Sequence, residues 1–413
     1  MQKFHNTLIT GLFVFVLTAA GALLLRNCSS ASASIEERAA RIHKQVFTVD
    51  THTDTPLRLI RGDFDFGRRN DPVETHSKVD IPRMKEGEMD AIWFAAFVGQ
   101  SERTKEGHAR ALQQAQRLVR VIHDLAAEYP DDLEIATGSN DLKRIARQGR
   151  HAIYIGLENG YPLGNDLSLI DTFYRQGIRY ITLVHTANND ICDSSTDSLE
   201  HGGLSSLGEQ MVDRMNDLGI MIDLSHASDD TFLDVVERSR TPVIASHSCA
   251  RALCDHPRNL SDDLLLRLKE NGGVIQLCLY SGYLKILEPN PLRDSARQAV
   301  VEKHGNYYEL DEEGKTAFLQ DWYEVDVDFP PDRATVSDAV DHIDHMVELI
   351  GIDHVGIGSD FDGGGELADC FDVSQMCNIT EELVRRGYTP REIRKIWGGN
   401  ITRVFRQVEQ AAL

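Results

Sequence analysis

Eight short apolar segments recur along the chain, and segments with the apolar spacing of helices separate most of them. Each is too short for a helix and lacks strict alternation of apolar and polar residues, which is typical of parallel strands buried on both faces. A strand followed by a helix, repeated eight times, predicts an α/β fold closed into a (β/α)8 TIM-type barrel. The predicted strands are residues 46–49, 91–97, 153–157, 180–184, 220–222, 242–245, 274–278 and 355–358.

The first 34 residues differ from the rest of the chain. Lys3 is followed by an apolar run from Leu8 to Leu25 and then by a stretch of small residues. This pattern is typical of an export signal, and Ala31-Ser32-Ala33 offers an A-x-A cleavage motif. The apolar run is also just long enough to span a bilayer, so an uncleaved membrane anchor is a second interpretation, and lipid attachment at Cys28 is a third. All three predict an exported protein that is periplasmic, extracellular or attached to the membrane through its N-terminus.

Residues 35–413 are expected to form a single catalytic barrel domain, with an irregular excursion at about 288–333. The net charge of −22, from 43 basic and 65 acidic residues, argues against nucleic acid and against an anionic membrane surface as partners. The seven cysteines show no spacing typical of a metal site. In an oxidising compartment, Cys249 could pair with Cys254, or Cys370 with Cys377.

His, Asp and Glu residues stand at the C-terminal ends of several predicted strands. His52 and Asp54 follow the first strand, and residues two apart in extended chain face the same side. In a closed barrel these strand ends meet at one rim, which is where active sites of this fold lie. An imidazole and a carboxylate at this spacing suit a borderline cation such as Zn²⁺. An H-x-D pair alone is weak evidence for a metal site. Its position after a barrel strand is what favours one.

Three further residues extend this predicted metal site. Glu158 ends the third predicted strand, and its two carboxylate oxygens could bridge two cations. His226 and His247 follow the fifth and sixth strands, so they are neighbours on the rim and would complete a second metal position. A single buried histidine is often satisfied by backbone groups alone. Five potential ligands at one edge of the barrel favour the metal centre.

Three other polar residues at the rim are candidates for contacts with a substrate. His185 follows the fourth strand, Arg258 lies in the loop after the sixth, and Asp360 follows the eighth. A histidine can donate to a developing oxyanion, an arginine can hold a carboxylate with two parallel bonds, and an aspartate can move protons. Asp362 competes with Asp360 for its role, and spacing alone supports Arg258 least.

These residues lie in segments that resemble the membrane (renal-type) dipeptidases, peptidase family M19. The resemblance runs in family order over residues 35–409. The matching segments are residues 49–54 (VDTHTD), 79–83 (VDIPR), 156–160 (GLENG), 177–185 (GIRYITLVH), 222–226 (IDLSH), 242–248 (PVIASHS), 258–260 (RNL) and 358–363 (GSDFDG).

The resemblance implies a binuclear zinc dipeptidase on a barrel of the metallo-dependent hydrolase type. It implies that His52 and Asp54 bind one zinc ion, that His226 and His247 bind the other, and that Glu158 bridges the two. Two zinc ions lower the pKa of a bridging water, so that a hydroxide can attack the peptide bond near neutral pH.

The resemblance also implies how the substrate is held. It assigns His185 to polarising the scissile carbonyl, Arg258 to binding the terminal carboxylate, and Asp360 to contacting the amine and relaying protons. Dipeptides are therefore the expected substrates, including those with a C-terminal D-residue, and a homodimer is the expected assembly.

Two alternatives remain open at this point. One is another barrel amidohydrolase that acts on acylated amino acids or cyclic amides. Many of those bridge their metals with a carboxylated lysine, whereas no lysine ends a predicted strand here. The other is a non-catalytic metal-dependent binding protein that retains the site, since a fold by itself does not prove an activity. The excursion at 288–333 is longer than in animal members of the family, so the substrate preference also stays open.

Overall fold

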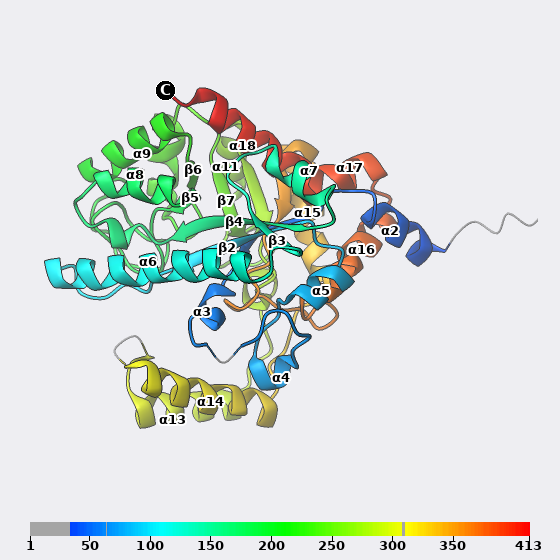
Figure 1. The fold of residues 1–413 in the computed structure, drawn as a ribbon, viewed down its shortest axis with the longest axis horizontal. Helices are drawn as coiled ribbons and strands as arrows, with labels where there is room; N and C mark the ends of the chain where they lie inside the picture. Colours follow the sequence, from blue (N-terminus) through cyan, green and yellow to red (C-terminus); the bar gives the residue numbers. More distant parts are fainter. Residues whose placement is uncertain (1–33, 63, 308–309) are drawn as a thin grey trace, which may run out of the picture.

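The computed structural model describes residues 34–62, 64–307 and 310–413, so the predicted N-terminal signal or anchor lies outside the described residues. Eight parallel strands pair in the order β1, β2, β4, β5, β6, β7, β8, β9, and a short β3 pairs with β4 (Figure 1). The strands are β1 (Val49–Thr53), β2 (Ala91–Phe97), β3 (Leu133–Ile135), β4 (His151–Glu158), β5 (Ile178–Thr182), β6 (Met221–Asp223), β7 (Ile244–Ser248), β8 (Val274–Leu277) and β9 (Val355–Ile357).

Two backbone hydrogen bonds join the first strand to the segment after the last one. The amide of Asp54 donates to the carbonyl of Phe361 at 2.8 Å, and the amide of Asp360 donates to the carbonyl of His52 at 3.0 Å. These bonds close the sheet, which confirms the predicted (β/α)8 barrel. They also bring two candidate site segments together, although about 300 residues separate them along the chain.

The strands differ from the predicted apolar runs where the site begins. β1 and β7 continue beyond their apolar runs and include His52 and His247 within the strand. The apolar pattern stops early in these two strands because their last residues are polar, although they are buried. β3 is too short and too polar to be predicted from its sequence, Leu133-Glu134-Ile135.

Most of the helices that follow strands begin at a Ser or Thr side chain that accepts a hydrogen bond from the first turn. Thr104, Ser205, Ser228, Ser261 and Thr335 cap α6, α9, α10, α11 and α15 in this way. The longer helices are α2 (Ile35–His43), α6 (Lys105–Glu128), α8 (Ser168–Arg175), α9 (Ser206–Leu218), α10 (Asp229–Arg238), α11 (Asp262–Asn271), α13 (Pro291–His304), α14 (Glu312–Asp328), α15 (Val336–Ile350), α16 (Cys377–Arg385) and α18 (Asn400–Ala411). The shorter ones are α3 (Pro56–Leu59), α4 (Pro72–Thr75), α5 (Ile81–Glu86), α7 (Asp141–Ala146), α12 (Ser281–Leu284) and α17 (Pro390–Arg394).

The C-terminal helix α18 covers the end of the barrel opposite the site. Its Ile401, Val404, Phe405 and Val408 are buried in a cluster with residues from the beginnings of the strands. The Phe405 ring meets the Trp93 ring edge to face, with 5.8 Å between centroids. The C-terminal tail therefore packs back on the core and covers this end of the barrel. Helix α2 lies beside α16 (Figure 1).

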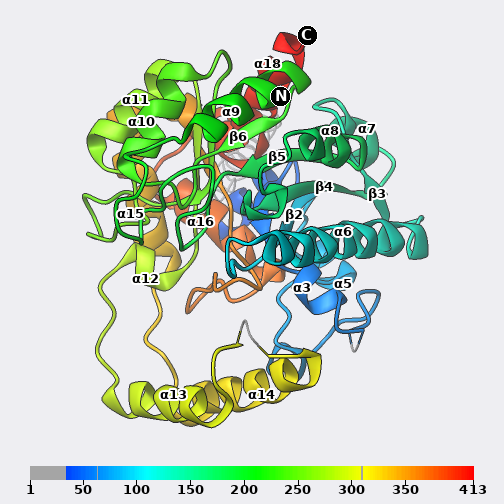
Figure 2. The same cartoon turned by 90° about the vertical axis from the view of Figure 1, so that its left-hand side faces the viewer.

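The excursion at 288–333 is a pair of helices, not an irregular segment. Helices α13 and α14 pack against each other on one side of the barrel, shown in yellow in Figures 1 and 2. Val300, Phe318 and Val325 form a small hydrophobic cluster of their own, separate from the main core. Because α14 carries apolar residues around much of its circumference, no single helical stripe marked it in the sequence.

Two further expectations concern membranes and disulfides. None of the helices among the described residues is long and apolar enough to cross a membrane. The six cysteines of the described residues are free thiols, so the pairs considered above, Cys249 with Cys254 and Cys370 with Cys377, do not form.

The segment Val79-Asp80-Ile81-Pro82-Arg83 has a structural role away from the site. The guanidinium of Arg83 is buried between the carboxylates of Asp80, at 2.8 Å, and Asp372, at 3.2 Å. Asp80 also caps α5 by accepting from the amide of Arg83. These contacts tie α5 to the segment after β9.

We expect Arg83→Met to lower the free energy of unfolding by about 3–5 kcal/mol, because it leaves two buried carboxylates without their cation. The control is Arg69→Met, which removes a half-exposed pair with Glu86 and should cost no more than about 1 kcal/mol. Urea unfolding measures both variants. Equal losses would contradict a stabilising role for the buried pair.

Candidate metal centre

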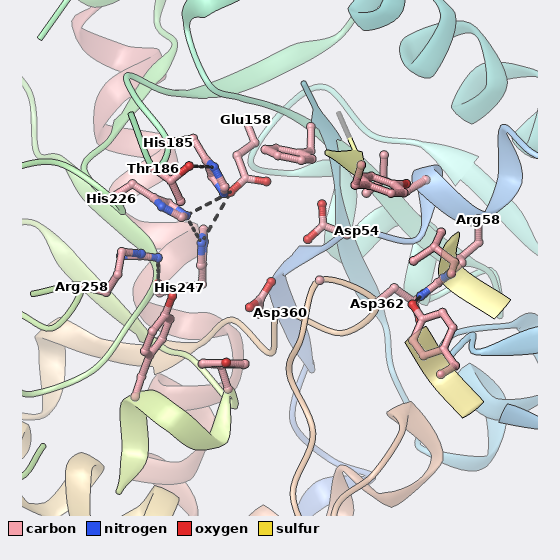
Figure 3. Close-up of a pocket in the computed structure, with 18 of the residues that line it drawn as sticks. Asp54, Arg58, Glu158, His185, Thr186, His226, His247, Arg258, Asp360 and Asp362 are labelled. Atoms are coloured by element: carbon pink, nitrogen blue, oxygen red, sulfur yellow. Dashed lines mark hydrogen bonds and ion pairs between the residues drawn. The ribbon is translucent and has the colours of Figure 1, made fainter. Parts of the chain in front are cut away.

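The candidate residues meet at the C-terminal ends of the barrel strands. A cavity of about 370 Å³ opens there, and seven of the eight predicted site residues line it (Figure 3). The eighth, His52, is fully buried and does not line the cavity. β1 and β7 supply His52 and His247, and β4 ends at Glu158. The seven lining residues are Asp54, Glu158, His185, His226, His247, Arg258 and Asp360.

The carboxylate of Glu158 lies between two sets of candidate ligands. Its Oε2 is 3.3 Å from Nε2 of His52, which in turn is 3.5 Å from Oδ2 of Asp54. Its Oε1 is 3.3 Å from Nε2 of His226 and 3.6 Å from Nε2 of His247. Each set brings its ligand atoms within 4.8 Å of one another. One carboxylate thus serves two adjoining positions, one per oxygen.

The donor atoms of this cluster fit metal ions. Nε2 of His52 and Oδ1 of Asp54 are buried without a hydrogen-bond partner among the described residues. Nε2 of His226 and Nε2 of His247 face each other at 3.0 Å. Buried polar atoms without partners are costly, and a cation satisfies them. Imidazole nitrogens combined with carboxylate oxygens suit Zn²⁺ and related divalent metals.

Hydrogen bonds on the far side of each imidazole fix its orientation. Nδ1 of His52 lies 2.9 Å from the hydroxyl of Tyr180, so Nε2 turns toward Glu158. Nδ1 of His247 lies 2.9 Å from the hydroxyl of Ser246, which donates to Asp223 at 2.6 Å. Such contacts set the tautomer and the basicity of metal-binding histidines.

Sequence reasoning missed Tyr180, Ser246 and two buried acids of this supporting layer. Asp50 accepts from the amide of Ser359 at 2.7 Å, and Asp223 accepts from the amide of Ser246 at 2.8 Å. Both acids stand inside apolar strands, two and three residues before a histidine. An acid inside a buried strand is unusual, and that is the signal that could have identified them.

Gly156 leaves the space that Tyr180 occupies. The two residues pair across β4 and β5, and a Cβ on Gly156 would lie 2.1 Å from the Tyr180 ring. A side chain at 156 would displace Tyr180 and therefore the hydrogen bond to His52.

Two site residues adopt left-handed backbone conformations. His226 has φ of 72° and Asp360 has φ of 63°. Such values are uncommon for residues other than glycine, and they cluster at functional sites. At both positions the turn directs the side chain back over the barrel mouth.

The two candidate acids after β9 have different surroundings. Asp362 accepts from the hydroxyl of Thr55 at 2.8 Å and from the amide of Lys78 at 2.7 Å, which fixes it as a support for neighbouring loops. The carboxyl of Asp360 instead faces the cluster, since one of its oxygens lies within 4.8 Å of ring nitrogens of His52 and His247. Burial and the nearby Asp54 carboxylate raise the pKa of Asp360. Of the two, Asp360 is the one placed to exchange a proton in the cavity.

His185 and Arg258 stand on the same side of the cavity as His226 and His247 (Figure 3). Burial and the charge of Arg258 lower the pKa of His185 to about 3, so its imidazole is neutral and can donate one hydrogen bond. Arg258 is 3% exposed, with Nη2 donating to the carbonyl of His247 at 3.1 Å. Its Nε has no hydrogen-bond partner among the described residues.

A parallel (β/α)8 barrel with a carboxylate between two His-rich ligand sets defines a class of metal-dependent hydrolase. The sequence matches the family model for membrane dipeptidase (Peptidase family M19) over residues 36–413. The chain belongs to this family and is a dipeptidase of the metallopeptidase type.

Named relatives and solved structures agree with this assignment. Dipeptidase 3 from Rattus norvegicus is 32% identical over 386 residues, 91% of this chain and 68% of that protein. Dipeptidase tcpJ from Claviceps purpurea (strain 20.1) is 32% identical over 372 residues, 88% and 77% of the two chains. The structure of the probable dipeptidase PvdM from Pseudomonas aeruginosa is 31% identical, with a TM-score of 0.79 over 92% of this chain and 99% of that one.

We expect Tyr180→Phe to weaken metal binding about 10- to 100-fold, because it removes the hydrogen bond that orients His52. Competition with a fluorescent zinc chelator measures the affinity. Tyr154→Phe is the matched control, since Tyr154 is also buried in the barrel but donates to the carbonyl of Gly138, away from the site. Equal affinities in both variants would contradict the role of Tyr180.

Proposed function

We propose that the protein is a binuclear zinc dipeptidase that hydrolyses the peptide bond of free dipeptides, including those with a C-terminal D-residue. The observation that carries the proposal is the placement of the two Glu158 oxygens, each 3.3 Å from a histidine nitrogen of a different ligand set. In this proposal His52 and Asp54 hold one ion, His226 and His247 hold the other, and Glu158 bridges them. When bound, two zinc ions supply a hydroxide near neutral pH and stabilise negative charge that develops on the substrate.

The remaining residues hold the substrate at its two ends and at its carbonyl. The unpaired Nε of the buried Arg258 supports its assignment to the terminal carboxylate. Asp360 takes the free amine and exchanges protons with it, and the neutral His185 donates to the scissile carbonyl oxygen. Recognition of both charged ends limits the substrate by length, so dipeptides fit and longer peptides do not.

We also propose that residues 35–413 act as one catalytic domain of a homodimer, and that residues 1–34 direct the chain out of the cytoplasm or hold it at a membrane. The apolar run and the A-x-A motif support export, and the family resemblance supports the dimer. Cell fractionation tests the export, and light scattering after gel filtration tests the homodimer.

The purified protein should contain two zinc ions per chain and should cleave L-Ala-L-Ala and L-Ala-D-Ala but not N-acetyl-alanine. Elemental analysis of the same samples used in the assay links metal content to rate. Removing the metal with a chelator should abolish activity. Replacing Glu158 with Gln should abolish both the binding of the second ion and activity. Full activity in the metal-free protein would disprove the mechanism, and preference for N-acetyl-alanine would favour a barrel amidohydrolase.

Arg258→Ala should raise the KM for dipeptides by about 10- to 100-fold and change kcat less, because a charged hydrogen-bond partner of the substrate carboxylate is lost. Steady-state kinetics measure both constants. Arg240→Ala is the control, since this half-exposed arginine pairs with Asp217 far from the cavity. A loss confined to kcat would assign Arg258 to the chemical step instead of binding.

A further inference from the structure

The cavity extends beyond the metal centre to a second wall. Figure 3 shows Arg258 and Arg58 on opposite sides, with Asp54 and Asp360 between them. Helix α3 contributes Leu57 and Arg58, and Arg61 follows two residues after its end. Helix α14 contributes Leu319 and Tyr323, and Tyr307 lies in the connection between α13 and α14. Both parts of this wall lie outside the residues assigned to metal and to the ends of the substrate.

Arg58 in this wall is a buried cation with unused hydrogen-bond donors. It is 6% exposed, and its Nη2 donates to the hydroxyl of Tyr323. Its Nε and Nη1 have no hydrogen-bond partner in the described part of the chain. Unpaired donors on a buried guanidinium cost free energy. A ligand that enters the cavity with an anionic group would satisfy them.

The neighbours of Arg58 do not neutralise it directly. The Asp362 carboxylate is in the same wall. One of its oxygens accepts from the hydroxyl of Thr55 and the other from the amide of Lys78. Within the described residues it forms no ion pair with Arg58. Arg61 lines the same cavity and adds a second positive charge. Two arginines and one aspartate therefore give this wall a net positive charge, which favours an anionic group of a ligand over a cationic one.

Tyr323 of the α13–α14 pair holds Arg58 in place. The Tyr323 ring stacks on the ring of His76, with 3.7 Å between centroids and 15° between planes. The Arg58 guanidinium carbon lies 5.2 Å from the centroid of the same ring. Arg58 thus contacts Tyr323 through its hydroxyl and its ring, and a side chain held in this way loses little conformational entropy when it binds a ligand.

We propose that Arg58 recognises an acidic side chain on the N-terminal residue of the dipeptide. This inference rests on the proposed function, in which Arg258 binds the terminal carboxylate and Asp360 the amine. With those two ends fixed, the N-terminal residue would be held at Asp360, and its side chain would be the part of the substrate nearest to Arg58. Figure 3 shows Asp360 between Arg258 and Arg58. A Glu or Asp side chain there accepts from Nε and Nη1 of Arg58.

The experiment compares L-Glu-L-Ala with L-Gln-L-Ala, which have nearly the same shape, on the zinc-loaded full-length protein. The wild-type ratio of kcat/KM should favour Glu by about tenfold or more, as expected for a charge-assisted contact. Arg58→Gln should bring the ratio close to one, and Arg58→Lys should leave an intermediate ratio. Arg61→Gln is the matched control, because it removes a charge from the same wall, and it should keep the ratio within about twofold of wild type.

Each outcome decides between the inference and the proposed function. A wild-type ratio near one, with L-Ala-L-Ala still cleaved, would overturn the inference and leave the dipeptidase proposal intact. An equal rise in KM for both substrates in Arg58→Gln would show that Arg58 binds the terminal carboxylate, which also overturns it. Loss of the ratio in Arg61→Gln alone would move the subsite to Arg61. Failure of the zinc-loaded wild type to cleave any dipeptide would overturn both proposals.

Discussion

The carboxylate of Glu158 is buried, with 2% of the residue exposed, at the centre of the barrel mouth. Burial raises the pKa of this group, because a charged carboxylate in a dry interior needs nearby positive charge. The histidines and carboxylates around it could hold a cation that would satisfy that need. The position of Glu158 is in turn fixed by strand pairing, since it lies beside Phe97 of β2 and Thr182 of β5. The ligand positions described above are all defined relative to this one side chain.

The orientation of the candidate metal ligands depends on a second layer of buried groups. Tyr180 orients His52, and Asp223 acts through Ser246 on His247. These residues belong to the strands themselves, so the rigid barrel carries the orientation of the ligands. Gly156 shows how narrow the tolerance is, because one added carbon at this position would meet the Tyr180 ring. The same strands that form the core thus also fix the donor atoms.

If Arg58 selects the substrate as inferred above, the barrel supplies the chemistry and the α13–α14 pair supports the selection. Strand ends supply every candidate metal ligand, which is the usual arrangement of this fold. The helical pair has its own small hydrophobic cluster and reaches the cavity through a few side chains, Tyr323 among them. Loops and insertions on a rigid scaffold can change without disturbing the core. Differences in this pair between relatives would alter the substrate preference while the metal centre stays the same.

Much of the fold and of the candidate site could be predicted from the sequence. Apolar runs of strand length, with helical segments between them, predicted the barrel, and the polar residues that end them predicted His52, Glu158 and His247 at one rim. These signals are local, because burial on both faces of a strand and the end of that burial are both written in neighbouring residues. Arg258 depended on the family resemblance, since a loop arginine has no local signal.

Only the tertiary structure decided the features that depend on residues far apart in the chain. Spacing alone left Asp362 as a competitor of Asp360, and the family resemblance assigned the role to Asp360. The structure gives the physical difference, because Thr55 and Lys78 occupy the carboxylate of Asp362. The sequence could not reveal the support of His52 by Tyr180, or the unpaired nitrogens of Arg58 beneath Tyr323, 265 residues away. The sequence by itself determined the strands and the types of ligand, because these follow from short-range patterns of polarity. The folded chain determined which polar atoms are satisfied and which remain free for a ligand, because that depends on contacts that only closure of the barrel creates.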